Sequence, residues 1–368
     1  MRLASAPEIT QTEMGSLFFI VTQGGLWQQL CMTARPPSNF LQRTQGARKI
    51  IVVDLGFLGD SIHVVPALWE LQRNYPGAEL HTLSAVLGAE TLHLAPCVTR
   101  PWAFPLTPDS PPWWRHWGLI AALRRERFDV AYNFSGADRT IFMTGLTGAP
   151  LRVAHAGGRE HFWSRWLIPN WVPRQDRSLP VYEQRRQVLA ACGFQLQPAR
   201  FDLQIPEDAS QWARQNVPTP AAHISINASG PEKEWPLDRW IGFTQSLLEK
   251  RPQLSVIATA GPKARERERV AALRTAVKHP RLLDFDGLSI ARFAALLQSC
   301  QLHVGADSGA LHLAMALGVP TLGVFRQYEG LNEWLPRGPA HRHLIAHSLD
   351  AISGDGMSAE ALAMLAQS

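Results

Sequence analysis

The chain has 368 residues, too many for one ordinary domain and enough for two. A hydrophobic fraction of 46% excludes a disordered chain, and a net charge of +5 fits an anionic partner such as a nucleotide, a phosphorylated lipid or a membrane surface. The basic residues form no run with interleaved aromatics, so a nucleic-acid partner is not expected.

Cysteine spacing and hydropathy bear on cellular location. No stretch of 18 apolar residues occurs, so no transmembrane helix is expected. The most apolar N-terminal segment, 14–32, has no basic region before it, which argues against a signal peptide. We expect an irregular extension there, with an interfacial membrane anchor as the alternative. Four widely spaced cysteines without a CxxC pair predict reduced, buried thiols in a cytoplasmic protein and no zinc site: Cys31, Cys97, Cys192 and Cys300.

Regular α/β structure is expected after this extension. The β-branched run 49–56 ends in Gly, as is typical of a buried parallel strand. An Asp-Ser pair at 60–61 starts a helix and a Pro-Gly pair at 76–77 ends it, giving a right-handed βαβ unit. Residues 157–182 show little periodicity and are predicted to be a long loop, followed by a helix at 183–194. The expected strands of this half are residues 49–56, 79–85, 128–134 and 151–156.

A Pro-rich polar segment at 203–221, with one short helix, separates this half from a second α/β series. The series closes at residue 325, and a final helix follows at about 357–367. Its expected strands are residues 223–229, 254–261, 281–287, 302–307 and 319–325. The helices between them are residues 238–250, 263–278, 289–300 and 309–317. This alternation predicts two doubly wound parallel-sheet domains of Rossmann type facing across a cleft, with a ligand at the carboxyl ends of the strands.

The first candidate motif, GFLGD at 56–60, stands at a strand-to-helix junction. Its glycines, Gly56 and Gly59, let backbone N–H groups approach a ligand closely, and Asp60 falls at a helix N-terminus, where the macrodipole stabilises a carboxylate. The competing interpretation is an N-cap aspartate on a tight turn. The motif is not the GxGxxG of dinucleotide-binding proteins.

The second motif, NASGPEKEWP at 227–236, follows the first strand of the second half. Lys233 is placed to neutralise a diphosphate leaving group, although a loop lysine is more often simply solvated.

The third motif, GADSGALH at 305–312, again joins a strand to a helix. The N–H groups of Ser308 and Gly309, with the helix dipole, suit a pyrophosphate. Asp307 is placed to bind sugar hydroxyls. His312 on the first helical turn is predicted to reach a phosphate oxygen, with a buried structural histidine as the alternative.

Two other charged patterns are weaker signals. The sequence Asp284-Phe285-Asp286 matches the DxD of metal-dependent glycosyltransferases, but its place at the end of a buried strand favours a turn or helix-entry role. The helix 263–278 alternates in charge, which is typical of a solvated face. A basic cluster in 159–186 lies in the N-terminal half, where an acidic acceptor would bind.

Taken together, the motifs resemble those of glycosyltransferase family 9, the lipopolysaccharide heptosyltransferases. Residues 58–68 (LGDSIHVVPAL) are similar to its N-terminal signature and look closer to heptosyltransferase I than to II. Residues 233–236 (KEWP) are similar to its K-x-W-P, and residues 307–314 (DSGALHLA) to its D-[ST]-G-x-x-H-[LA]-A. Asn133 stands where the family often has the Asp of D-x-x-G. The resemblance covers about residues 49–345.

The resemblance implies a role for each matched position. Asp60 matches the catalytic base, Lys233 the lysine at the donor phosphates and Asp307 the residue at the donor heptose. The phosphate-binding turn is matched by Ser308, Gly309 and His312. Ser229 falls near the hydroxyl contacts to the phosphates, whereas Ala228 departs from the hydroxyl residue that is common there. Loop or acceptor-side positions are Gly56, Gly59, Arg139, Arg159 and Arg165.

The implied fold is GT-B and the implied reaction an inverting, metal-independent transfer of heptose from ADP-heptose to an anionic glycolipid or glycan. Asp60 would deprotonate the acceptor hydroxyl, and Lys233 would stabilise the departing diphosphate without a metal. No other cofactor is implied. The implied location is cytoplasmic, with a peripheral contact on the inner membrane. The expected domains are an extension (1–48), an acceptor domain (49–210), a donor domain (211–345) and a C-terminal helix (346–368).

Three other functions compete with this interpretation. One is a GT-B glycosyltransferase that uses another nucleotide sugar or a protein acceptor. Another is a non-catalytic nucleotide-sugar binding protein, which the presence of Asp60 and Lys233 disfavours. The third, an NAD-dependent oxidoreductase, lacks GxGxxG after the first strand of either half.

Overall fold

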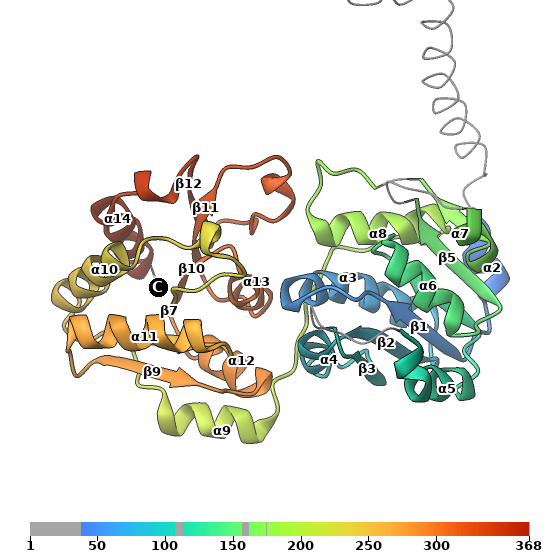
Figure 1. Ribbon diagram of the computed structural model, residues 1–368, viewed down its shortest axis with the longest axis horizontal. Coiled ribbons are helices and arrows are strands. Elements are labelled where there is room, and N and C mark those ends of the chain that lie inside the picture. The colour runs from blue at the N-terminus through green and yellow to red at the C-terminus, as the bar shows by residue number, and fades with distance from the viewer. Residues whose placement is uncertain (1–37, 107–112, 157–161, 174, 368) are drawn as a thin grey trace, which may run out of the picture.

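The computed structural model describes residues 38–106, 113–156, 162–173 and 175–367. It has two lobes, each built on a six-stranded sheet whose strand pairs are all parallel (Figure 1). The expected α/β class with two doubly wound domains is therefore confirmed. The expected boundary between residues 210 and 211 falls within helix α9 (Glu207–Asn216).

The first sheet has the order β3-β2-β1-β4-β5-β6. Its strands are β1 (Lys49–Val53), β2 (Glu79–Ala85), β3 (Arg100–Phe104), β4 (Val130–Asn133), β5 (Leu151–His155) and β6 (Asn170–Val172). Its helices are α2 (Phe40–Thr44), α3 (Leu58–Asn74), α4 (Val86–Leu92), α5 (Trp117–Arg125), α6 (Asp138–Leu146), α7 (Phe162–Leu167) and α8 (Val181–Ala191), with a 3-10 turn η1 (Trp113–His116).

The second sheet has the order β9-β8-β7-β10-β11-β12, the same winding as the first. Its strands are β7 (Ala221–Ser225), β8 (Ser255–Ala260), β9 (Leu282–Asp286), β10 (Leu302–Ala306), β11 (Thr321–Arg326) and β12 (His341–Ala346). Its helices are α10 (Leu237–Lys250), α11 (Ala264–Val277), α12 (Ile290–Gln298), α13 (Gly309–Ala316) and α14 (Gly354–Leu365), with 3-10 turns η2 (Pro231–Lys233), η3 (Leu331–Glu333) and η4 (Leu349–Ala351).

Local sequence explains most of these elements. The central strands β1 and β7 are short and buried almost throughout, as strands covered by helices on both faces must be. Helix α12 begins where the Ser289 hydroxyl accepts a hydrogen bond from the Arg292 N–H, a serine N-cap. The amphipathic helices α10 and α12 bury their apolar faces against the second sheet.

Two predictions about the elements were wrong. The segment 157–182 is not a continuous loop, because it includes α7 and the three-residue edge strand β6, which pairs with β5. The second series does not close at residue 325, because β12 pairs with β11 beyond it. Both strands lie at sheet edges, and most of their side chains are polar or only partly buried, so they lack the apolar run by which buried strands are found. The elements α4, β3 and α6 were also not predicted.

The N-terminal extension is only partly described. Residues 14–32, with their expected irregular structure or interfacial anchor, lie outside the described residues, as does Cys31. Helix α2 packs the fully buried Phe40 into the first core, and the Leu41 N–H donates to the carbonyl of Cys192. Cys97, Cys192 and Cys300 are buried free thiols, as expected, and burial raises the pKa of each to about 12.

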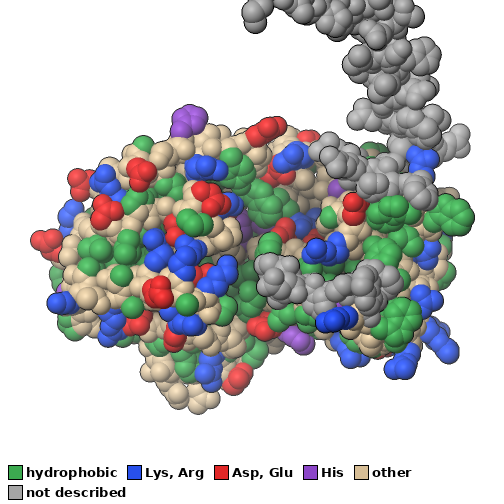
Figure 2. Space-filling view, viewed as in Figure 1, with side chains coloured by type: hydrophobic (Ala, Val, Ile, Leu, Met, Phe, Trp, Pro, Cys, Tyr) green, Lys and Arg blue, Asp and Glu red, His purple; other side chains and the backbone are tan. Residues whose placement is uncertain are grey.

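The two lobes meet along α3 and α13, which lie side by side at the centre of the molecule (Figure 1). A core cluster crosses this junction, in which Ile62 and Leu94 of the first lobe pack with Leu313 and Leu297 of the second. The space-filling view shows a hollow between the lobes with acidic and basic side chains on its walls (Figure 2).

Candidate functional site

The candidate site lies where both sheets reverse their winding direction. In the first sheet the reversal falls between β1 and β4, and in the second between β7 and β10. Open parallel sheets bind ligands at the carboxyl ends of the strands at this point. The three candidate motifs directly follow β1, β7 and β10, and the α3–α13 contact brings the first and third together.

Asp60 is the third residue of α3, and not the N-cap that the competing interpretation expected. The N-cap is Phe57, whose backbone N–H donates to Asp60 Oδ2 at 3.0 Å. Asp60 Oδ1 lies 3.4 Å from an Nη atom of Arg185. The carboxylate therefore stabilises the first turn of α3 while its side chain stays 27% exposed, so it remains accessible to a proton donor.

Two charged residues lie beside Asp60 that the sequence did not connect with it, since Arg185 was only part of the basic cluster in 159–186 and Asp54 was not singled out. Arg185 on α8 is buried and donates to Asp54 Oδ2 through Nε at 3.0 Å and through Nη2 at 2.8 Å. Asp54 is equally buried, just past the end of β1, and also accepts from the Gly56 N–H. Burial opposes a charge on Arg185, but the carboxylates of Asp54 and Asp60 outweigh it and raise the pKa of the guanidinium.

The glycines of the first motif serve close packing. A Cβ at Gly56 would lie 2.2 Å from Cβ of Asp60, so only glycine leaves room for that side chain. A Cβ at Gly59 would lie 3.0 Å from the ring of His312 in the other lobe. Likewise, a Cβ at Gly309 would meet Leu58 at 2.6 Å. Glycine at these positions therefore lets the N-termini of α3 and α13 approach each other.

Lys233 and Asp307 form the centre of the second-lobe site. Lys233 Nζ lies 2.7 Å from Asp307 Oδ2, and the Tyr328 hydroxyl lies 3.5 Å from the same oxygen. His312 Nε2 is 3.9 Å from Oδ1. Burial favours the neutral acid, but His312 and Lys233 outweigh it and lower the pKa of Asp307. The carboxylate is therefore ionised at neutral pH and can accept hydrogen bonds from hydroxyl groups.

Two buried polar atoms just past the carboxyl ends of β7 and β10 have no hydrogen-bond partner among the described residues. They are Oγ of Ser308, the N-cap of α13, and Oδ1 of Asn227, which follows β7. Buried polar atoms are usually satisfied, so these two are suited to a ligand. Ser229 is exposed in the adjacent loop. The first N–H groups of α13 point out of the same helix end, which favours an anion there.

The loop with Lys233 is held in place by Glu234. This carboxylate accepts from the Ala228 N–H at 3.2 Å and pairs with Arg265 at 2.7 Å and Arg269 at 3.4 Å. The expectation that the whole charged face of α11 is only solvated was thus wrong, because two of its arginines turn inward to the loop. Trp235 is fully buried and donates to the carbonyl of Ile352, so it belongs to the core.

His312 is buried, as the structural alternative expected, and its contact with a phosphate oxygen stays a prediction. It is buried in the lobe junction, with Nδ1 3.1 Å from Nε2 of His63, and it also faces Asp307. Burial lowers the pKa of His63 well below its usual value, so that ring is neutral at neutral pH. One histidine therefore links the first-lobe helix α3 to the second-lobe site.

Comparison with known proteins identifies the family of this chain. The family model "Glycosyltransferase family 9 (heptosyltransferase)" matches residues 116–345, well over half of the chain. The chain belongs to glycosyltransferase family 9. It is therefore a glycosyltransferase.

Two curated relatives in this family are similar along most of their length. The lipopolysaccharide core heptosyltransferase OpsX of Haemophilus influenzae is 22% identical, with 78% of this chain and 82% of the relative covered. The lipopolysaccharide heptosyltransferase 1 of Pseudomonas aeruginosa is 26% identical, with 75% and 78% covered.

Solved structures of the family share the fold. The ADP-heptose lipopolysaccharide heptosyltransferase II of Escherichia coli has a TM-score of 0.72 at 20% identity, with 87% of this chain and 99% of that chain covered. The Escherichia coli heptosyltransferase WaaC, solved with ADP, has a TM-score of 0.71 at 18% identity, with 86% and 99% covered. The expected GT-B architecture is thereby confirmed.

Two of the three arginines expected on the acceptor side belong to the described residues. Arg139 and Arg165 are exposed on α6 and α7, and α7 lies at the outer end of the first lobe, away from α13 (Figure 1). Arg159 lies outside the described residues. The roles of these three in acceptor binding remain predictions.

Two groups bear on metal binding in this family 9 chain. Asp284 and Asp286 lie on the edge strand β9, and Asp284 pairs with Arg274 of α11, which favours the structural role over a metal-binding DxD. Among the described residues, one set of side chains is close enough to hold a metal ion: Glu79, His81 and Glu126. Lys49 Nζ already lies 3.3 Å from the carboxylate of Glu79 and 2.8 Å from that of Glu126. This set stands at the amino ends of the strands.

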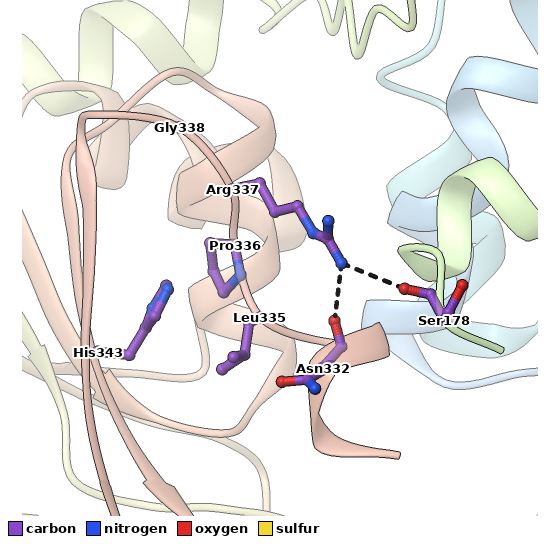
Figure 3. Close-up of a pocket in the computed structure, with 7 residues that line it drawn as sticks. All are labelled: Ser178, Asn332, Leu335, Pro336, Arg337, Gly338 and His343. Atoms are coloured by element: carbon purple, nitrogen blue, oxygen red, sulfur yellow. Dashed lines mark hydrogen bonds between the residues drawn. The ribbon is translucent and has the colours of Figure 1, made fainter.

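A pocket of about 350 Å³ lies beside the junction of the lobes (Figure 3). Arg337 from the second lobe reaches across it to the carbonyl of Ser178 in the first, at 3.5 Å. Its lining includes none of the candidate catalytic or donor-binding residues. The residues that line the pocket are Ser178, Asn332, Leu335, Pro336, Arg337, Gly338 and His343.

Within the described part of the chain, no helix combines the length and the apolar character that crossing a membrane requires.

Proposed function

We propose that this family 9 enzyme transfers a heptose from ADP-heptose to a lipopolysaccharide core or a related glycan acceptor. The curated relatives at 22% and 26% identity are named as lipopolysaccharide heptosyltransferases, and one solved neighbour holds ADP-2-deoxy-2-fluoro heptose. We also propose that the first lobe binds the acceptor and the second the donor. On this proposal the enzyme works at the cytoplasmic face of the inner membrane, with a peripheral contact.

The observation that carries the proposal is the meeting of two helix N-termini. Asp60 stands on the first turn of α3, and Ser308 and Gly309 open α13, which packs against it. One helix end holds a carboxylate able to accept a proton, and the other offers N–H groups to a diphosphate. A sugar between them has a base on one side and its leaving group on the other.

The chemistry follows from this placement. Asp60 accepts the proton of the acceptor hydroxyl as its oxygen attacks the anomeric carbon. The bond to the diphosphate breaks on the opposite face, so the configuration inverts. Lys233, His312 and the N–H groups of α13 stabilise the charge that develops on the diphosphate, so this mechanism needs no metal. Asp307 binds hydroxyl groups of the heptose.

The variant D60N tests the base. The amide keeps the size of the side chain but cannot take a proton at neutral pH, so we expect transfer to fall by at least about 10²-fold, with ADP binding unchanged. Transfer at the wild-type rate would show that Asp60 is not the base.

Calorimetric titration with ADP, UDP, GDP and their sugars, in the presence of EDTA, tests the donor. Metal-independent preference for ADP and ADP-heptose is expected. Preference for UDP- or GDP-sugars would retain the fold and the mechanism but replace the donor. Absence of nucleotide binding would indicate a degenerate family member or a wrong site assignment.

A further inference from the structure

Asp60 does not stand alone, because the buried pair Asp54–Arg185 adjoins it from two other elements. Arg185 donates to both carboxylates, at 2.8 Å to Asp54 and 3.4 Å to Asp60. Its remaining atom, Nη1, is buried and has no partner among the described residues. A buried ion pair contributes little net stability relative to apolar packing, so its place beside the reactive carboxylate calls for a functional explanation.

We propose that Arg185 and Asp54 are positioning residues that fix the orientation of the Asp60 carboxylate and set its basicity. The inference rests on the proposed role of Asp60 as the base. The two residues act through Asp60 and not on the substrate.

Orientation follows from the hydrogen bonds. Asp60 Oδ2 accepts from the Phe57 N–H and Oδ1 faces Arg185, so both oxygens have a fixed donor. Asp54 in turn holds the guanidinium through two hydrogen bonds and is itself held by the Gly56 N–H. The carboxylate is thus held from α3 and α8 at once, which limits its rotation before the acceptor arrives.

Basicity follows from the charges. A cation at this distance, acting alone, would stabilise the ionised Asp60 and weaken it as a base. Asp54 supplies the compensating negative charge, so the guanidinium can orient Asp60 without abolishing its affinity for a proton. Burial raises the pKa of Asp54, but at neutral pH Arg185 and Asp54 contribute no net charge together, and Asp60 is the unbalanced carboxylate.

Three histidines of the described part of the chain also face this trio. His63 belongs to α3, His155 to β5, and His312 to α13 beside Gly59. Burial lowers the pKa of His63 and of His155, so both rings are neutral at neutral pH. Charge changes at Arg185 and Asp54 are therefore the direct way to alter Asp60.

The test is a set of charge variants assayed for transfer from ADP-heptose as a function of pH. D54N leaves Arg185 uncompensated, so the acidic limb of kcat/KM should move to lower pH by about one unit. R185Q leaves Asp54 uncompensated, so the limb should move to higher pH. The double variant D54N/R185Q should return it toward the wild-type position.

The conservative variant R185K separates orientation from charge. It keeps the cation but loses the planar two-point contact, so kcat should fall while the acidic limb stays near its wild-type position. A merely structural pair would lower the rate or the stability without moving the limb in opposite directions. ADP affinity, measured by calorimetry, should be unchanged in every variant because the donor lobe is untouched.

The inference would be overturned if the acidic limb of kcat/KM lay at the same pH in D54N, R185Q and wild type. When D60N has lost transfer, that result counts against this inference alone, and the proposed function then stands. If R185Q does not fold, D54N decides alone by the same criterion. Transfer that survives in D60N would overturn the base itself and, with it, this inference.

Discussion

Lys233 and Asp307 come from loops after different strands, β7 and β10, and meet at 2.7 Å. A lysine paired in this way is already ordered before the proposed diphosphate binds, so less side-chain entropy is lost on binding. Asp307 keeps its oxygens ionised because Lys233 and His312 stabilise the charge despite burial. On the proposed function, the ion pair prepares a site for both a phosphate and a sugar.

We predict that K233M weakens ADP binding by about 10- to 100-fold, because a charged hydrogen bond to phosphate is worth about 1.5–3 kcal/mol. Transfer should fall at least as much. Calorimetry with ADP measures the first effect and a transfer assay the second. The control K250M changes an exposed lysine at the end of α10 and should leave both unaltered. Equal ADP affinity in K233M and wild type would contradict the assigned role.

At the scale of elements, the contact between α3 and α13 depends on small residues. Gly59 accommodates the ring of His312, and Gly309 accommodates Leu58. Each helix therefore brings its N-terminal turn against the other, and the candidate base and anion site are neighbours because of this packing. A side chain at either glycine would have to move the facing helix or its side chains.

We predict that G309A destabilises the protein by about 1–3 kcal/mol and lowers kcat/KM by 10-fold or more, since the new methyl group would overlap Leu58. The matched control is G242A in the middle of α10, where no atom lies within 4 Å of the added Cβ. That change should stabilise the protein by about 0.5–1 kcal/mol. Urea unfolding of both variants tests the prediction, and similar effects of the two would refute it.

At the scale of the whole molecule, several neutral histidines are buried in the framework. His223 and His303 face each other across β7 and β10, with their Nδ1 atoms 2.8 Å apart, and His63 lies in the junction of the lobes. Burial lowers the pKa of His303 to about 3 and lowers those of His63 and His223 well below the usual value. In the unfolded chain all three titrate near pH 6.5.

These shifts predict early loss of stability in acid. From about pH 6.5 down to the lowered folded pKa values, the unfolded chain binds more protons, so the free energy of unfolding falls as pH falls. Each such histidine contributes a slope of about 1.4 kcal/mol per pH unit. Urea unfolding at pH 7, 6 and 5 measures it, and H303N should reduce the slope by one such contribution. G242A should keep the wild-type slope, and a flat profile from pH 7 to 5 would contradict the prediction.

The sequence by itself determined the α/β class, most of the helices and buried strands, and the three strand-to-helix motifs. These features depend on apolar periodicity and on turn residues within one short segment. Asp60, Lys233, Asp307 and Ser308 could be singled out for the same reason, since each follows a predicted strand.

Only the tertiary structure decided which groups surround those residues. Arg185 stands 131 positions from Asp54, and nothing in its helix distinguishes it from its neighbour Arg186. The inward turn of Arg265 to Glu234 and the pairing of β12 likewise depend on partners distant in sequence. A charge acquires its function from the burial and the opposite charges around it, and folding alone brings these together.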